Sequence, residues 1–177
     1  MKTNFVELPI STRDGKFLAR YSEKGLAELN FPNSGAERPS GQAARQRRPT
    51  KQNVVPAKVR DWHRVTEAAL KKILAGSEPG KFPPLDLAGT AFQKSVWHAL
   101  RKIALGKTRS YGEIAAAVGR PRAVRAVGGA CGANPVPVLV PCHRVLAANT
   151  KLGGFSGGLD WKRRLLAREG ILYRQSA

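Results

Sequence analysis

The sequence predicts an α/β protein of the α+β kind, with an N-terminal antiparallel sheet flanked by a helix and a C-terminal part that is mostly helical. Three observations predict this class. Residues 5–31 alternate apolar and polar side chains in short runs, residues 56–74 repeat apolar side chains at helical spacing, and residues 90–132 carry successive helix-start signals. A Pro- and Gly-rich segment separates the two parts. We therefore expect an N-terminal α+β domain over residues 1–89 and a C-terminal domain over residues 90–177.

Three short strands are expected at residues 5–11, 16–22 and 26–31, where the turn signal Asp14-Gly15 favours an antiparallel meander. A helix should then run from Pro56 to Leu74. Its apolar face is predicted to consist of Val59, Trp62, Val65, Ala69 and Ile73. His63 lies off this face, so we expect it at the surface.

Residues 34–53 contain five Lys/Arg, one Glu and almost no large apolar side chain. Such a segment cannot bury enough apolar surface to offset the entropy of ordering it. It is therefore predicted to be a mobile basic loop, and a phosphate-binding or nuclear-targeting segment is the alternative interpretation.

The C-terminal half is predicted to begin with three helices. Thr90 with Gln93, and Ser110 with Glu113, have the spacing of capping boxes for the first two. The first helix should end near Gly106, and its apolar stripe consists of Phe92, Val96, Leu100 and Ile103. The second helix should stop at Gly119. Pro121 fits the first turn of a third helix, which should run to about Gly132. Two helices so closely joined are typical of a DNA-binding helix-turn-helix or of an ordinary helical hairpin.

The third of these helices contains Gly128 and Gly129, each of which costs about 1 kcal/mol relative to Ala. Something must therefore approach its backbone closely. Either another helix packs tightly there, or the helix contacts a DNA groove, an interpretation that the neighbouring arginines favour.

Charge points to a polyanionic partner. The chain carries 31 Lys+Arg against 12 Asp+Glu, a formal net charge of +19, and nucleic acid is the first candidate for such an excess. Residues 90–177 hold 15 basic and 3 acidic residues, whereas residues 1–89 hold 16 and 9, so the C-terminal half is the better nucleic-acid surface. No apolar run approaches the length of a membrane span, and the first ten residues lack a signal-peptide layout. We expect a soluble, intracellular protein.

Two cysteines, Cys131 and Cys142, are too few for a disulfide framework or a four-Cys zinc site. Cys142 follows the apolar run 135–140, which we expect to be a buried strand, and precedes His143. A lone Cys beside a core strand is more often inert than nucleophilic. His143 favours the nucleophile, because a base must generate the thiolate when the thiol pKa is about 8.5.

Glu169 is the candidate for orienting His143. It lies in the last turn of a helix predicted from about Leu159, where the macrodipole disfavours a carboxylate by about 0.3–1 kcal/mol. A buried partner would compensate for this position. The alternative is that nearby arginines offset the charge at the surface, namely Arg163, Arg164 and Arg168.

Five segments, in this order and spacing, resemble the O6-alkylguanine-DNA alkyltransferases (methylated-DNA--protein-cysteine methyltransferases). They are SYGEIA at 110–115, RAVRAVGGACGANPVP at 122–137, PCHRV at 141–145, GGFSGG at 153–158 and LLAREG at 165–170. The resemblance covers residues 90–170, and the N-terminal half matches only in size and strand-rich character. It implies a two-domain α/β fold whose C-terminal domain holds a helix-turn-helix and a short two-stranded element. It also implies DNA repair in which the alkyl group on O6 of guanine moves irreversibly to the protein's own cysteine, once per molecule.

By this resemblance Cys142 is the alkyl acceptor, His143 activates it through a bound water, Glu169 holds His143 and Asn134 braces the site. The other expected substrate contacts are the hydroxyls of Tyr111 and Ser156, the carbonyls of Cys142 and Val145, the aromatic wall of Phe155, where some relatives carry tyrosine, and Gly157 of the glycine-rich loop.

The resemblance further implies that the helix-turn-helix enters the minor groove of double-stranded DNA containing O6-alkylguanine. Arg125 would fill the stack after the base has flipped out, which the chemistry requires. The residues expected beside it at the DNA are Arg122, Ala123, Ala126 and Gly128. The expected partner is duplex DNA, no membrane association is expected, and the protein is expected to be a monomer. No cofactor is implied, and a zinc site like that of some relatives is not expected, because residues 1–89 contain no Cys and a single His. The expected compartment is the cytoplasm, on the nucleoid in a prokaryote.

Three other functions compete with this one. A non-enzymatic relative that only binds alkylated guanine has the cysteine replaced, whereas this sequence keeps Cys142. A cysteine hydrolase would have no use for a basic helix-turn-helix. A transcriptional regulator with an unreactive thiol should bind one DNA sequence much more tightly than others.

Overall fold

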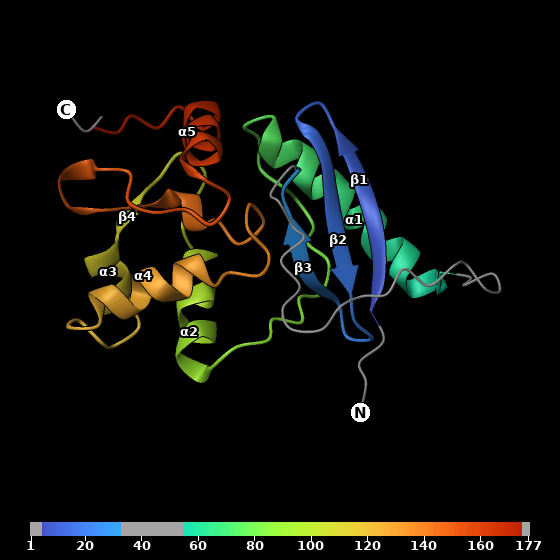
Figure 1. Cartoon of the computed structure of the whole chain (residues 1–177), viewed down its shortest axis with the longest axis horizontal. Coiled ribbons are helices and arrows are strands. Elements are labelled where there is room, and N and C mark those ends of the chain that lie inside the picture. Colours follow the sequence, from blue (N-terminus) through green and yellow to red (C-terminus); the bar gives the residue numbers. More distant parts are fainter. Residues whose placement is uncertain (1–4, 33–54, 175–177) are drawn as a thin grey trace.

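The computed structural model describes residues 5–32 and 55–174 (Figure 1). Its N-terminal half holds a three-stranded sheet and one long helix, and its C-terminal half holds shorter helices around a two-stranded element. This mixed content confirms the predicted fold class. The predicted basic loop at 34–53 lies outside the described residues.

The sheet is an antiparallel meander in the order β1-β2-β3, as the alternation of apolar and polar residues predicts. Its strands are β1 (Val6–Thr12), β2 (Gly15–Tyr21) and β3 (Leu26–Asn30). Thr12 pairs with Gly15 across the turn between β1 and β2. Gly15 has φ +115°, a conformation that favours glycine.

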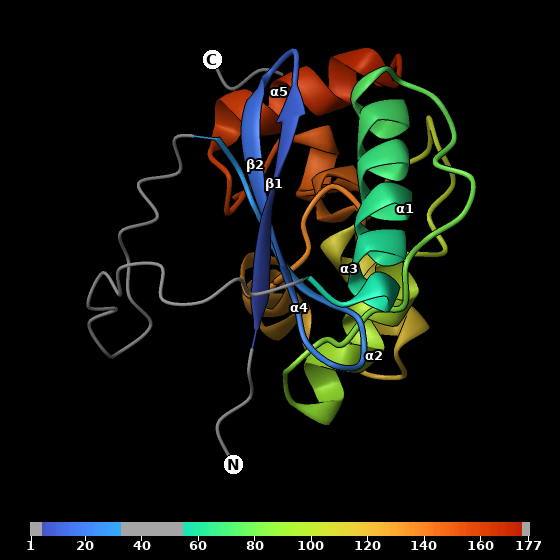
Figure 2. The same ribbon diagram turned by 90° about the vertical axis from the view of Figure 1, so that its right-hand side faces the viewer.

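Helix α1 (Ala57–Leu74) lies along one face of this sheet (Figure 2). The predicted apolar face is wrong at Val65, which is half-buried and not part of the core, whereas half-buried Trp62 packs against the core as predicted. The buried positions are Val59, Thr66, Ala69, Leu70, Ile73 and Leu74. His63 is not a simple surface residue either, because its Nδ1 lies 3.1 Å from the hydroxyl of buried Tyr21. The sheet therefore contacts a broader stripe of the helix than apolar spacing alone indicates.

The C-terminal half contains α2 (Ala91–Leu100), α3 (Tyr111–Ala117), α4 (Val124–Gly132), α5 (Leu159–Arg168), the 3-10 turns η1 (Cys142–Arg144) and η2 (Ala148–Thr150), and the parallel pair β4 (Arg109–Ser110) and β5 (Val145–Leu146). Both predicted capping boxes are present, with Thr90 and Ser110 accepting from the amides three residues on. None of the described helices is long and apolar enough to cross a bilayer.

Two predicted boundaries in this half are wrong. Helix α2 ends at Leu100 and not near Gly106, because short bonds such as Ile103 N to Leu100 O (3.0 Å) tighten the chain and turn Ile103 into the core. Pro121 does not start α4. It lies in a turn that the bond from Ala123 N to Arg120 O (2.8 Å) closes before the helix begins.

The run 135–140 is buried as predicted, but it is not a strand. Val140 N donates to Val136 O at 2.9 Å, and Val138 has φ +74°, so the chain folds back on itself. Prolines at 135 and 137 have no amide hydrogen to contribute to a strand ladder. A compact turn therefore leads into η1.

One hydrophobic cluster includes residues from both halves of the chain. Trp161 of α5 packs against Phe17 and Phe31, with ring centroids 5.5 and 4.8 Å apart, and Phe31 also contacts Phe155 at 5.7 Å. The sheet thus supports both α5 and the glycine-rich loop that follows η2.

Gly157 makes this support testable, because a Cβ added there would lie 2.5 Å from Cε2 of the buried Phe31 ring. We expect Gly157→Ala to lower the free energy of unfolding by about 1–3 kcal/mol through overpacking. Urea denaturation measures this change. Gly154→Ala is the matched control in the same loop, since its Cβ would meet nothing within 4 Å. Equal stability of the two variants would contradict the packing of Gly157 on Phe31.

Candidate active site

Asn134 organises the turn that leads to Cys142. Its side-chain Nδ2 donates to Val140 O at 2.8 Å, and its Oδ1 accepts from Val136 N at 3.1 Å. The same Nδ2 lies 3.2 Å from Cys142 Sγ. From the other side, Leu29 N of β3 donates to Pro135 O at 2.8 Å, which ties the turn to the sheet. The buried amide therefore fixes both the turn and the sulfur.

Cys142 begins η1 and is only 3% exposed. Burial raises the pKa of its thiol to about 11, although the hydrogen bond from Asn134 and the charge of Lys162 act in the opposite direction. The resting sulfur is therefore a protonated thiol at neutral pH. A nearby base must take its proton before it can act as a nucleophile.

The next residue, His143, is fully buried and paired with Glu169. Its Nε2 lies 2.8 Å from Glu169 Oε1. Arg144 binds the same carboxylate at two points, Nε to Oε2 at 2.9 Å and Nη2 to Oε1 at 3.0 Å. Gly106 N also donates to Oε2 at 3.3 Å. The carboxylate thus has a partner on every side despite its place at the end of α5.

The pKa shifts of this group follow from burial and pairing. Burial by itself would raise the pKa of Glu169, but the hydrogen bonds and charges of His143 and Arg144 prevail and lower it to about 2. Burial also lowers the pKa of His143, and Glu169 opposes that shift only in part. At neutral pH the site therefore holds a neutral imidazole beside an ionised carboxylate that Arg144 already compensates.

The free nitrogen of His143 is the chemically important one. Since Nε2 faces a carboxylate that can only accept, it carries the proton, and Nδ1 has the lone pair. Nδ1 is buried with no hydrogen-bond partner among residues 5–32 and 55–174. An unpaired basic nitrogen on the residue next to a buried thiol can accept its proton, directly or through one water.

Two charged residues of the site were missed by sequence reasoning. Arg144 is 6% exposed, and its Nη1 also donates to Ile103 O at 2.6 Å. Lys162 is fully buried, and its Nζ donates to Val145 O at 2.7 Å and to the carbonyl of Leu152. Burial lowers the pKa of Lys162 to about 8. A signal for Lys162 did exist, because it shares the inward stripe of α5 with Leu165, Leu166 and Glu169.

Cys142 is one of the residues that line a cavity of about 490 Å³, a size within the range of small-molecule sites. Its lining includes most of the predicted substrate residues and one unexpected thiol: Tyr111, Gly128, Cys131, Gly132, Cys142, Gly154, Phe155 and Ser156. The Tyr111 hydroxyl lies 3.5 Å from Gly154 O, and burial raises its pKa to about 12. Burial likewise raises the pKa of Cys131 to about 12, so this second thiol is protonated.

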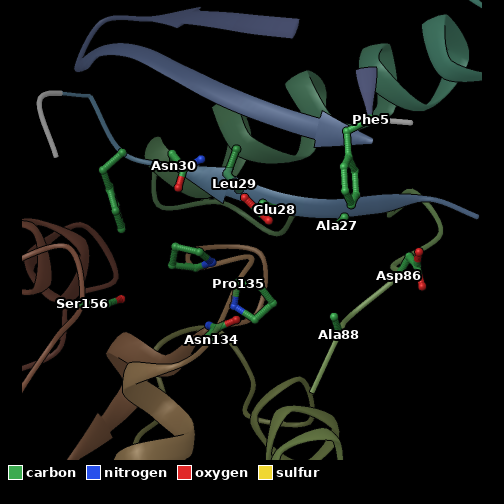
Figure 3. A pocket seen from close by; sticks show the side chains of 12 residues that line it. Phe5, Ala27, Glu28, Leu29, Asn30, Asp86, Ala88, Asn134, Pro135 and Ser156 are labelled. Atoms are coloured by element: carbon green, nitrogen blue, oxygen red, sulfur yellow. The ribbon is translucent and has the colours of Figure 1, made fainter. Parts of the chain in front are cut away.

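A second hollow of about 450 Å³, which Asn134 helps to line, lies between β3 and the connection through Asp86 (Figure 3). Ser156 borders both hollows, so the glycine-rich loop separates them. Gly157 does not line either one. It packs against Phe31, so its role is to let the loop approach the sheet.

The predicted DNA-contact residues gather on α4 and the turn before it. Arg122, Arg125 and Ala126 are exposed, and neither arginine forms an ion pair with a described residue. Packing does not explain the two glycines, since a Cβ at Gly129 would meet nothing within 4 Å and one at Gly128 would only reach Tyr111 at 4.0 Å. The face of α4 is therefore open to a close partner.

The alternative pairing of Glu169 with surface arginines is not what the structure shows. Arg168 binds Asp14 and Arg163 binds Asp160, whereas Arg144 pairs with Glu169. No cluster of three or more His, Cys, Asp or Glu that could hold a metal occurs in the described part of the chain.

Known proteins are similar to this chain in sequence and fold. The family model for the 6-O-methylguanine DNA methyltransferase DNA binding domain matches residues 91–171. A methylated-DNA--protein-cysteine methyltransferase of Haemophilus influenzae is 52% identical over 90 residues, which cover 51% of this chain and 50% of the relative. The match thus spans about half the length of that relative.

Two further relatives are matched over more of their own length. A methylated-DNA--protein-cysteine methyltransferase of Methanosarcina acetivorans is 48% identical over 110 residues, which cover 62% of this chain and 70% of the relative. The crystal structure of Mycobacterium tuberculosis OGT in complex with DNA superimposes with a TM-score of 0.67 and 35% identity, covering 91% of this chain and 90% of that one. The chain therefore belongs to the 6-O-methylguanine DNA methyltransferase family.

Proposed function

We propose that this protein repairs DNA by moving the alkyl group from O6 of guanine onto Cys142. The observation that carries the proposal is the buried Cys142 in the lining of a cavity, next to a neutral imidazole whose Nδ1 has no described partner. The names of the relatives and the OGT complex with DNA support the same activity.

In the proposed reaction, the thiol proton passes to His143 Nδ1, through a water, as the sulfur attacks the alkyl carbon. The bond between this carbon and O6 breaks as the sulfur–carbon bond forms, and its electron pair stays on the guanine. Hydrogen bonds from the Tyr111 and Ser156 hydroxyls stabilise that charge. The product is a thioether, from which nothing at the site displaces the alkyl group, so each molecule acts once.

Recognition of the base would combine two residues of the cavity lining, Cys142 and Phe155, with Val145, which does not line the cavity. The carbonyls of Cys142 and Val145 would accept from the exocyclic amine of guanine, and Phe155 would provide an aromatic wall. Val145 O already accepts from Lys162, but a carbonyl oxygen has two lone pairs and can accept twice. Lys162 therefore orients this acceptor without consuming it.

The target base must leave the duplex, because O6 of a paired guanine cannot be approached in line by sulfur. We propose that α3 and α4 act as a helix-turn-helix in the minor groove, with the small residues of α4 against the backbone and Arg125 in the vacated stack. The proposed division at residue 89 leaves DNA binding and alkyl acceptance to residues 90–177. The protein would act as a monomer.

Incubation with excess duplex DNA containing O6-methylguanine should place a single methyl group on Cys142. Cys131 should stay unmodified, although it lines the same cavity, since it has no neighbouring base. Mass spectrometry of proteolytic peptides measures both thiols. Cys142→Ala should still bind DNA and accept no methyl group. Repeated turnover by one molecule, or methylation of Cys131 in place of Cys142, would contradict the proposal.

Arg125→Ala should slow repair of duplex DNA far more than reaction with free O6-alkylguanine, because the free base needs no extrusion. Single-turnover rates on the two substrates measure the difference. Arg122→Ala is the control for loss of charge alone. Its decrease in repair rate should disappear as ionic strength is lowered, as expected of a phosphate contact. If Arg125→Ala slows the reactions with both substrates equally, or if low salt fully restores its rate on duplex DNA, Arg125 does not take part in base flipping.

A further inference from the structure

We propose that Asp14, in the turn between β1 and β2, is a positioning residue for alkyl transfer that holds the end of α5 carrying Glu169. Asp14 belongs to the N-terminal half, outside the 91–171 segment that the family model matches. The inference rests on the proposed role of Glu169 at His143. It assigns to the N-terminal half a direct part in arranging the active site.

The contact is a two-pronged ion pair between distant parts of the chain. Arg168 Nη1 donates to Asp14 Oδ2 at 2.9 Å, and its Nη2 donates to Oδ1 at 2.5 Å. The side chain of Asp14 is 8% exposed and that of Arg168 is 22% exposed, so solvent screens this pair less than an open surface bridge. Arg168 immediately precedes Glu169, and fixing one limits the movement of the other.

The turn that carries Asp14 is itself anchored. Asp14 N donates to Thr12 Oγ1 at 3.1 Å, and Arg13 Nη2 donates to Leu74 O, at the end of α1, at 2.8 Å. Just past α1, Gly76 has φ +74°, and a Cβ there would overlap the carbonyl oxygen of Arg168. The hairpin tip, the end of α1 and the end of α5 therefore meet, and Figure 2 shows the hairpin tip beside α5.

Charge explains why an acid is needed at this point. Arg13, Arg164 and Arg168 all approach Asp14. The hydrogen bond from Arg168 has the largest effect on the Asp14 pKa, and together with the three positive charges it keeps this pKa below its usual range. Without the carboxylate these guanidinium groups would repel one another at the end of α5. Glu169 caps that end against an unfavourable helix dipole, so its position depends on contacts from outside the helix.

The test compares Asp14→Asn, Arg168→Gln and the double variant with the unaltered chain. Because a small displacement of a catalytic group has large kinetic effects, we expect the transfer rate at saturating DNA to fall by about tenfold in each single variant. The DNA concentration for half-saturation should not change. The double variant should be no slower than the slower single variant, since each single substitution already removes the same Asp14–Arg168 interaction.

Glu7→Gln is the matched control, because it removes a bridge to Arg20 (2.9 Å) on the same sheet but outside this contact. It should transfer at the unaltered rate. Thermal melting shows whether each variant is folded at the assay temperature. Transfer by Asp14→Asn at the unaltered rate, or additive losses in the double variant, would overturn the proposal.

Amide hydrogen exchange separates this proposal from the proposed function. The amides of residues 169–171 donate to the last turn of α5 and should exchange faster in Asp14→Asn but not in Glu7→Gln. If the unaltered chain transfers no alkyl group, the proposed function fails, and the exchange result still decides whether Asp14 holds this end of the helix. Unchanged exchange in Asp14→Asn would refute the contact.

Discussion

The buried carboxylate of Glu169 determines how the rest of the site is arranged. An acid at the end of a helix and away from solvent is costly, and here Arg144, His143 and Gly106 all donate to it. Arg144 compensates its charge, which leaves His143 free to remain neutral. The tautomer of His143 is then fixed, with the lone pair on Nδ1. The proposed activation of Cys142 depends on these contacts to Glu169, because they keep His143 neutral with its lone pair on Nδ1.

The resting thiol is not prepared as a thiolate in advance. Burial raises the pKa of Cys142 to about 11, and the hydrogen bond from Asn134 and the charge of Lys162 only partly oppose this. A protonated sulfur is a weak nucleophile toward adventitious electrophiles, which suits the proposed reaction, in which each molecule acts once. In the proposed reaction, transfer to His143 begins when the alkyl carbon lies in line with the sulfur.

Local signals in the sequence predicted much of the fold, and they failed where side-chain hydrogen bonds or contacts with distant residues decide the conformation. Ser110 and Glu113 predicted the start of α3, since a capping box needs only its own residues. The strand expected at 135–140 is a turn, because the side chain of Asn134 supplies hydrogen bonds that spacing does not reveal.

Pairing between distant side chains was equally hidden. The pairing of Glu169 with His143 was expected, partly from the resemblance, whereas its pairing with Arg144 was not. The positions of Arg168 against Asp14 and of Lys162 beneath Val145 required the packing of α5 on the remainder of the chain. From the sequence alone, Arg168 is predicted on an exposed face of the helix, and the position of Lys162 is predicted to belong to an apolar stripe.

The protonation state of His143 tests the central claim most directly. The chain has three histidines, so nitrogen-15 NMR of labelled protein, with His63→Gln and His98→Gln for assignment, can identify the ring signals of His143. We predict a neutral ring at pH 7 with its proton on Nε2, and loss of this strict preference in Glu169→Gln. A proton on Nδ1, or an imidazolium at neutral pH, would contradict the account, because His143 could not then accept the proton of Cys142.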